Sequence, residues 1–126
     1  MSARILVIED NAANLDLMTY LLRALGYDVS SELNGLSGLK TAIERPFDLV
    51  LADILMPQMD GYEFARRFKA DPHLADVPLI AVTALAMAGD REKIIAAGFN
   101  GYLSKPIDPQ NFAAQIDAFL NKKIDG

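Results

Sequence analysis

The chain has 126 residues and carries 12 lysines and arginines against 17 aspartates and glutamates, so its net charge is −5 with the single histidine neutral. A chain of this length can bury one real core, and 52% hydrophobic with 23% charged residues argues against disorder. The absence of cysteine excludes disulfides, thiolate zinc sites and cysteine nucleophiles, and the acidic balance disfavours a nucleic-acid partner.

The apolar pattern bears on location and on the number of domains. No apolar run approaches the roughly 18 residues of a membrane-spanning helix, and the N-terminus lacks the apolar region of a signal peptide. No linker or low-complexity segment interrupts the sequence. We expect a single cytoplasmic domain over residues 1–126, with no membrane partner and no separate output domain.

The first part of the chain alternates between strand and helix patterns. The continuous apolar run 5–8 predicts a strand covered on both faces. The apolar face of the next helix consists of Leu15, Met18, Leu22 and Leu25. Gly26 ends this helix. A weaker strand follows at 28–33, and a helix at about 36–44 stops before Pro46.

The same alternation continues through the middle of the chain. The apolar runs 49–52 and 79–82 predict two further strands covered on both faces. The helix between these strands contains Phe64, Ala65 and Phe68. Another helix runs from about residue 88 to residue 97 and ends at Gly98.

The last strand and helix complete the pattern. Residues 101–104 predict a weaker strand, and Asp108 as N-cap with Pro109 begins the last helix. The apolar stripe of that helix is Phe112, Ile116, Phe119 and Leu120. The alternation predicts an α/β fold, namely a flavodoxin-like (βα)5, doubly wound, parallel five-stranded sheet in the order 2-1-3-4-5, with helices on both faces.

Polar side chains stand where four of the predicted strands end. In this fold, ligands bind beyond the carboxyl ends of the strands. The residues at these ends are Glu9, Asp10, Asp53, Thr83, Ser104 and Lys105. We therefore expect three carboxylates, a hydroxyl and an ammonium group to converge on one edge of the sheet.

Three clustered carboxylates repel one another, and a divalent cation relieves the repulsion. Ligands that are all oxygen favour Mg²⁺, or Mn²⁺ in its place, over zinc, and Mg²⁺ readily shares its shell with a phosphate. Lys105 can then neutralise one phosphoryl oxygen and Thr83 can donate to another. Asp53 is available as a nucleophile that forms an acyl phosphate. The pattern predicts phosphoryl transfer to an aspartate.

Each of these residues has an ordinary explanation when it is taken alone. An aspartate after a strand, such as Asp53, is usually a turn or N-cap residue. The acidic pair after the first strand can cap the first helix, unless Asn11 or Asn14 is the cap. Lys105 can be a solvated surface residue and Thr83 a good strand residue. Their joint occurrence at four strand ends favours a functional site.

Four segments carry a family resemblance. They are residues 5–11, 48–61, 82–84 and 102–106. Through them, and over essentially its whole length, the chain resembles the receiver domain of two-component response regulators, the CheY-like superfamily. Residues 9–11 with Asn14, and residues 84–90, further resemble the stand-alone cell-division receivers of the DivK type and the receivers of hybrid histidine kinases.

The resemblance implies roles for the acidic residues. Asp53 would be the phosphorylated residue. Asp10 and Asp53 would bind Mg²⁺ directly, with the backbone carbonyl of Leu55, and Glu9 would act through a metal-bound water. Many members carry aspartate where this chain has Glu9. Glutamate keeps the charge of aspartate and is one methylene longer, so we expect metal binding to survive.

The resemblance also implies a switch. Thr83 would move toward the phosphoryl group and Tyr102 would turn inward behind it. Lys105 would contact the phosphoryl group, and its bond to Pro106 would be the family's cis peptide. The phosphoryl group would come from a sensor histidine kinase or a histidine phosphotransfer protein.

The readout surface would consist of the fourth helix, fifth strand and fifth helix, with the apolar residues 85–87 beside it. A downstream protein would bind there, and the chain would be a signalling domain, monomeric or weakly dimeric, rather than an enzyme. Leu55 and Leu85 offer no hydrogen-bonding or basic group to an attacking water, so we expect a long-lived phosphate. His73 lies in a polar loop and is expected to be a surface residue.

Other functions remain open. A dehalogenase-class hydrolase with an aspartate nucleophile would want a second aspartate where this chain has Leu55. A flavin carrier would want a Ser/Thr/Gly-rich phosphate loop after the first strand, and residues 10–14 are not one. A receiver cut from a hybrid histidine kinase, or a binding-only pseudo-receiver, are further alternatives.

Overall fold

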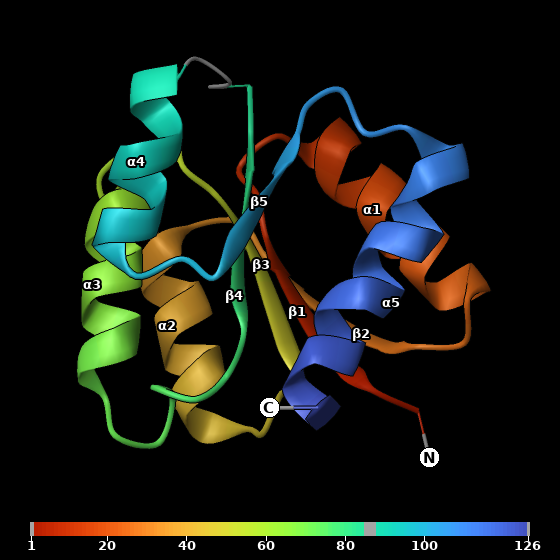
Figure 1. Ribbon diagram of the computed structural model, residues 1–126, viewed down its shortest axis with the longest axis horizontal. Coiled ribbons are helices and arrows are strands. Elements are labelled where there is room, and N and C mark those ends of the chain that lie inside the picture. Colours follow the sequence, from red (N-terminus) through yellow and green to blue (C-terminus); the bar gives the residue numbers. More distant parts are fainter. Residues whose placement is uncertain (1, 85–87, 126) are drawn as a thin grey trace.

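Five parallel strands form the central sheet of the protein, in the spatial order β2-β1-β3-β4-β5 (Figure 1). The computed structural model describes residues 2–84 and 88–125. The strands are β1 (Arg4–Ile8), β2 (Asp28–Glu32), β3 (Leu49–Asp53), β4 (Leu79–Thr83) and β5 (Gly101–Ser104). Every neighbouring pair is parallel, so the predicted flavodoxin-like sheet and its strand order are confirmed.

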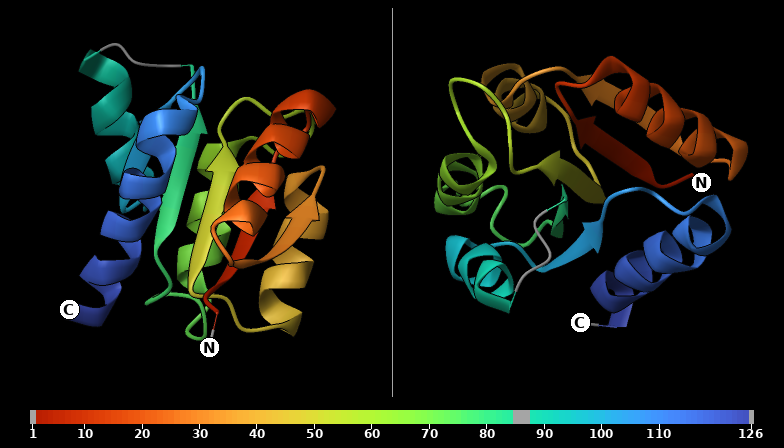
Figure 2. Two further views of the ribbon diagram at one scale, coloured as in Figure 1. Left: turned by 90° about the vertical axis from the view of Figure 1, so that its right-hand side faces the viewer. Right: turned by 90° about the horizontal axis from the view of Figure 1, so that it is seen from above.

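Helices cover both faces of the sheet, as predicted. They are α1 (Ala12–Ala24), α2 (Gly35–Glu44), α3 (Gly61–Ala70), α4 (Ala88–Ala97) and α5 (Pro109–Asp125). Helices α1 and α5 lie on one face, and α2, α3 and α4 lie on the other (Figure 1, Figure 2). Within the described part of the chain, no helix has both the length and the hydrophobicity to cross a membrane.

The central strands are mostly apolar because both of their faces are covered. In β1, Ile5 and Val7 point into the core beneath α1 and α5, whereas Leu6 and Ile8 point into the core beneath α2, α3 and α4. All four side chains are closed to solvent. Strands β2 and β5 lie at the sheet edges and are less buried. The weaker patterns of these two strands therefore reflect their place in the sheet.

Two helices begin at the side chains that the sequence indicates. Asn11 is the N-cap of α1, and its side-chain oxygen accepts a hydrogen bond from the backbone N–H of Asn14 at 3.0 Å. Asp108 immediately precedes α5, and its carboxylate accepts from the backbone N–H of Gln110 at 3.1 Å. Asn11, not the acidic pair before it, is therefore the cap of α1.

One residue of the predicted apolar face of α1 is exposed. Leu15, Met18 and Leu22 are buried, but Leu25 is 45% exposed, so that part of the prediction is wrong. Leu25 is the C-cap residue, and the next residue, Gly26, has a φ of 92° in the left-handed region. The N–H of Leu25 still donates to the carbonyl of Leu21, so the helical path reaches Leu25, but the buried face of α1 ends at Leu22.

Gly61 allows α3 to start against the end of β3. Its backbone N–H donates to the carbonyl of Ile54 at 2.8 Å. A Cβ atom at Gly61 would lie 2.5 Å from the Cα of Ile54 and 2.6 Å from the carbonyl oxygen of Asp53. Both atoms belong to the backbone, which cannot move aside as a flexible side chain can. Glycine is therefore favoured at position 61, where the start of α3 lies against the end of β3.

We expect Gly61→Ala to lower the free energy of unfolding by about 1–3 kcal/mol, the usual cost of forcing extra volume into a packed site. Chemical denaturation followed by circular dichroism measures it. Gly89→Ala, in a helix where the structure describes no atom within 4 Å of the added Cβ, is the matched control and leaves stability unchanged or slightly higher. Equal stability of the two variants would contradict this explanation of Gly61.

Candidate functional site

The carboxyl ends of the strands gather the predicted site residues at one edge of the sheet. Glu9 follows β1, Asp53 ends β3, Thr83 ends β4 and Lys105 follows β5. Glu9 and Thr83 are fully buried, and Asp53 is only 5% exposed. Because the strands are parallel, segments far apart in the sequence reach the same edge of the sheet (Figure 2). The structure therefore places the carboxylates, the hydroxyl and the ammonium group together.

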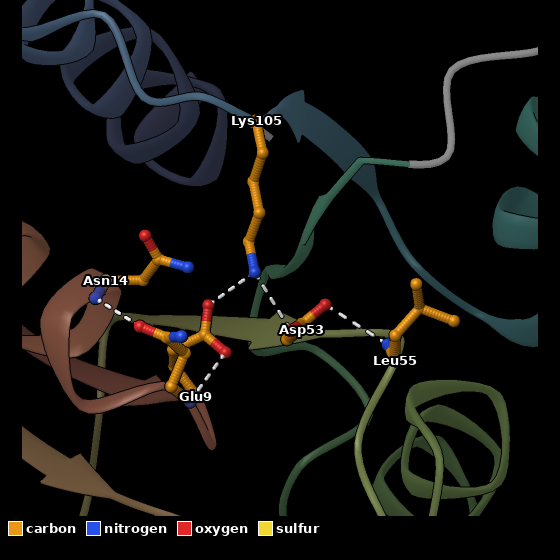
Figure 3. Close-up of polar contacts among 6 residues, drawn as sticks. Glu9, Asn14, Asp53, Leu55 and Lys105 are labelled. Atoms are coloured by element: carbon orange, nitrogen blue, oxygen red, sulfur yellow. Dashed lines mark hydrogen bonds and ion pairs between the residues drawn. The ribbon is translucent and has the colours of Figure 1, made fainter.

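Lys105 bridges two buried carboxylates. Its Nζ lies 2.5 Å from Oε1 of Glu9 and 2.9 Å from Oδ2 of Asp53 (Figure 3). The Lys105 side chain is 18% exposed, so water screens these contacts less than it screens a surface ion pair. The ammonium group supplies the opposite charge that lets both carboxylates be buried.

Backbone N–H groups hold the other oxygens of the same carboxylates. The N–H of Leu55 donates to Oδ1 of Asp53 at 3.1 Å, and the N–H of Asn11 donates to Oε2 of Glu9 at 3.2 Å. Each carboxylate is thus fixed at both oxygens, one toward Lys105 and one toward its own loop (Figure 3). The side chain of Leu55 itself is 57% exposed at the rim of the cleft.

Burial and charge act against each other on the ionisable groups. Burial raises the pKa of Glu9 from 4.5 to about 7; the hydrogen bond from Lys105 opposes this rise and the nearby Asp53 adds to it. Burial alone would lower the pKa of Lys105, but hydrogen bonds and charges from Glu9 and Asp53 outweigh it, so the pKa is raised. The cleft therefore keeps Lys105 charged and makes an ionised Glu9 costly without a further cation.

The acidic residues fit a hard divalent cation. Glu9, Asp10 and Asp53 each offer a carboxylate oxygen, and these oxygens lie within 4.8 Å of one another. Asp10 is exposed, so the group is open to solvent on one side. Oε1 of Glu9 is buried and, among the described residues, has no well-oriented hydrogen bond besides its ion pair with Lys105. Closely spaced oxygen ligands with an open side suit Mg²⁺.

The predicted switch residues lie on the adjacent strands. The backbone carbonyl of Thr83 accepts from the N–H of Lys105 at 2.9 Å. The peptide bond between Lys105 and Pro106 is cis, as the resemblance implies. Tyr102 is half-buried on β5, and its hydroxyl accepts hydrogen bonds from Arg91 of α4. Predictions for residues 85–87, which include Leu85, lie outside the described residues.

Arg91 is the residue near this site that the sequence analysis missed. It is exposed on α4, and its contact with Tyr102 depends on how the helix is turned against β5. A charged residue on a surface helix usually faces water, so no sequence pattern marks Arg91. His73 is exposed in its loop, as predicted, and takes no part in the cleft.

We expect Glu9→Gln to change how stability depends on pH in buffer that contains EDTA. Between pH 4.5 and about 7, the folded wild type keeps a proton on Glu9 that the unfolded chain releases, so its stability falls as pH rises. The variant lacks this effect. The free energy of unfolding of Glu9→Gln minus that of the wild type should therefore rise by about 3 kcal/mol across that range.

Chemical denaturation at a series of pH values measures this difference. Glu44→Gln is the matched control, because the Glu44 carboxylate is exposed on α2 and stays hydrated in the folded protein. Its difference from the wild type should stay constant. A constant difference for Glu9→Gln as well would show that Glu9 is not held protonated in this cleft.

The chain matches known proteins over nearly all of its length. The response regulator receiver domain family matches residues 5–117. The polar-differentiation response regulator DivK of Brucella anthropi is 40% identical over 120 residues, which are 95% of this chain and 98% of that protein. DivK of Brucella ovis is 39% identical over 120 residues, with 95% and 98% of the two chains covered.

Solved structures agree with these relatives. The receiver domain of a sensor histidine kinase from Pseudomonas aeruginosa, which holds a magnesium ion in its active-site cleft, is 35% identical. The match covers 100% of this chain and 100% of that receiver domain, with a TM-score of 0.86. Chemotaxis protein CheY4 of Vibrio cholerae, at 24% identity, shares the fold with a TM-score of 0.90 over 94% of this chain and 99% of its own. With a family match across most of its length and a response regulator as a 40% identical relative, this chain belongs to the response regulator receiver domains of two-component signalling.

Proposed function

We propose that the protein accepts a phosphoryl group on Asp53 from a phosphohistidine of a sensor histidine kinase or a histidine phosphotransfer protein. The observation that carries this proposal is the position of Lys105, whose Nζ lies 2.9 Å from Oδ2 of Asp53 inside an acidic cleft. An ammonium group there can bind a phosphoryl oxygen as soon as one arrives. The family supports a cytoplasmic location, and the lack of cysteine is consistent with it.

In the proposed step, a carboxylate oxygen of Asp53 attacks the phosphorus atom. The P–O bond forms as the P–N bond to the donor imidazole breaks, and the bonding electron pair leaves with the imidazole nitrogen. Lys105 turns from the carboxylate to a phosphoryl oxygen and stabilises the charge of the loose transition state. The backbone N–H of Leu55 keeps Asp53 oriented through its other oxygen.

The acidic cluster completes the proposed site. Asp10, Asp53 and the backbone carbonyl of Leu55 would hold Mg²⁺ directly, and Glu9 would hold it through a water molecule. When bound, Mg²⁺ supplies positive charge that offsets the clustered carboxylates and the phosphoryl oxygens. The support is the spacing of the three carboxylates, within 4.8 Å of one another, and the magnesium in the related receiver structure.

The output is a change of surface rather than a released product. Phosphorylation adds about −1.5 to −2 charges to the cleft. Thr83 moves toward the phosphoryl group and Tyr102 turns inward behind it, which alters the surface of α4, β5 and α5. A downstream protein binds the altered surface. The ligand thus shifts a population between two conformations, because the new contacts exist in only one of them.

We expect Asp53→Asn to abolish labelling by a small-molecule phosphodonor while the fold stays intact. Labelling of the wild type should require Mg²⁺ and disappear with EDTA. Phosphate-affinity electrophoresis measures the labelled fraction, and circular dichroism checks the fold. Asp16→Asn, which removes an exposed carboxylate from α1, is the matched control and should be labelled like the wild type.

Each alternative function predicts a different result in the same experiment. Continuous release of phosphate without a stable adduct would identify a hydrolase. A wild type that is never labelled would be a binding-only pseudo-receiver. Stoichiometric labelling of Asp53→Asn would place the acceptor elsewhere, and any of these three results would overturn the proposal.

We also expect the phosphate on Asp53 to last for minutes or longer in the isolated, magnesium-saturated protein. Leu55 stands 57% exposed at the rim and offers an attacking water no hydrogen bond. Leu55→Gln, which adds a hydrogen-bonding group of similar size, should shorten the lifetime several-fold. Loss of label after the phosphodonor is removed measures the lifetime, and a wild-type half-life of seconds would contradict the prediction.

A further inference from the structure

Tyr102 lies on the same face of the sheet as Thr83. Tyr102 pairs with Ala81 on the neighbouring strand, and Thr83 is two residues beyond Ala81. Side chains two residues apart on a strand point to the same side, so Tyr102 and Thr83 both face the layer of α2, α3 and α4. Tyr102 packs against the buried core of that layer. Tyr102 and Thr83 therefore lie on the same face of neighbouring strands, two residues apart in register.

Arg91 of α4 binds Tyr102 by both its polar end and its ring. The guanidinium Nε and Nη2 donate to the Tyr102 hydroxyl at 3.1 Å and 2.6 Å. The guanidinium carbon also lies 5.3 Å from the centre of the Tyr102 ring, within cation–π range. These contacts, which we call the Arg91–Tyr102 contact, fix the hydroxyl on the side of α4.

We propose that Arg91 is a positioning residue that holds Tyr102 outward in the unphosphorylated protein and so sets how readily the switch operates. This inference rests on the proposed function. An inward turn of Tyr102 must break both hydrogen bonds and move the ring away from the guanidinium group. The Arg91–Tyr102 contact is therefore present in one conformation and lost in the other, which is the condition for biasing an equilibrium.

In this proposal Arg91 weakens binding of the phosphoryl group by stabilising the outward state of Tyr102, although Arg91 itself does not line the site. If Tyr102 turns inward when the phosphoryl group binds, anything that stabilises the outward state weakens that binding, by up to the same factor. Removing the guanidinium group should then favour the inward state before any phosphate arrives. Because Arg91 is exposed, we expect a modest effect of about threefold to tenfold rather than a complete switch.

The test uses the full chain with saturating Mg²⁺ and beryllofluoride as a phosphoryl mimic. Arg91→Ala should bind beryllofluoride about threefold to tenfold more tightly than the wild type. Arg91→Lys keeps the positive charge but loses the paired N–H donors of the guanidinium group. Its affinity for beryllofluoride should therefore lie between those of the wild type and Arg91→Ala. Lys93→Ala is the matched control, because it removes a cation from an exposed position on the same helix. It should bind like the wild type.

A second readout follows Tyr102 in the absence of any phosphoryl mimic. The tyrosines are replaced with 3-fluorotyrosine, and the Tyr102 fluorine signal is assigned with Tyr102→Phe. In unliganded Arg91→Ala, this signal should move from the wild-type position toward the position in the beryllofluoride complex. In the Tyr102→Phe background, Arg91→Ala should change beryllofluoride affinity much less, because the hydroxyl acceptor is gone.

The outcomes separate this inference from the proposed function. If the wild type neither accepts label nor binds beryllofluoride, the proposed function fails and the role of Arg91 fails with it. If the wild type does both and Arg91→Ala matches it in affinity and fluorine signal, the role of Arg91 alone is refuted. An equal effect of Arg91→Ala with and without the Tyr102 hydroxyl would also refute it.

Discussion

The ammonium group of Lys105 holds together the charges on which the cleft is built. It contacts Glu9 at 2.5 Å and Asp53 at 2.9 Å, and the three residues follow or end three different strands. Two buried carboxylates this close would otherwise force one of them to take up a proton. The raised pKa of Glu9, about 7, shows that one ammonium group does not fully offset the burial. The remaining imbalance is what a divalent cation can relieve, and in the proposed function the same ammonium group binds a phosphoryl oxygen.

The fold could be predicted from the sequence because a strand that is buried on both faces appears there as a continuous run of apolar residues. Strands covered on both faces are apolar along most of their length, and in β1, β3 and β4 four of the five residues are apolar. The ends of α1 could also be predicted from the sequence, because a single residue decides each of them: Asn11 at the start and Gly26 at the end. The apolar repeat placed Leu25 on the packed face of α1, but this C-cap residue is 45% exposed. Periodicity describes a face, and only the backbone decides where that face stops.

The sequence predicted which residues line the site, but not which of their side chains contact one another. Parallel strands bring their carboxyl ends to one edge, so Glu9, Asp53 and Lys105 were expected together from their positions alone. The sequence indicated Lys105 as a ligand for a phosphoryl group, whereas in the structure it spans Glu9 and Asp53. Arg91 gave no signal, because its contact with Tyr102 follows from the rotation of α4 against β5. Pairings of long side chains at the surface depend on packing that no local pattern records.

In the proposed function, Asp53 is the residue that carries the phosphoryl group. Reduction with borohydride after treatment with a phosphodonor and Mg²⁺ tests it most directly, because an acyl phosphate on aspartate is converted to homoserine. Peptide mapping by tandem mass spectrometry then locates the product. We expect homoserine at position 53 alone, and no product when Mg²⁺ is chelated. Homoserine at Asp10 or at another aspartate, with Asp53 unchanged, would contradict it.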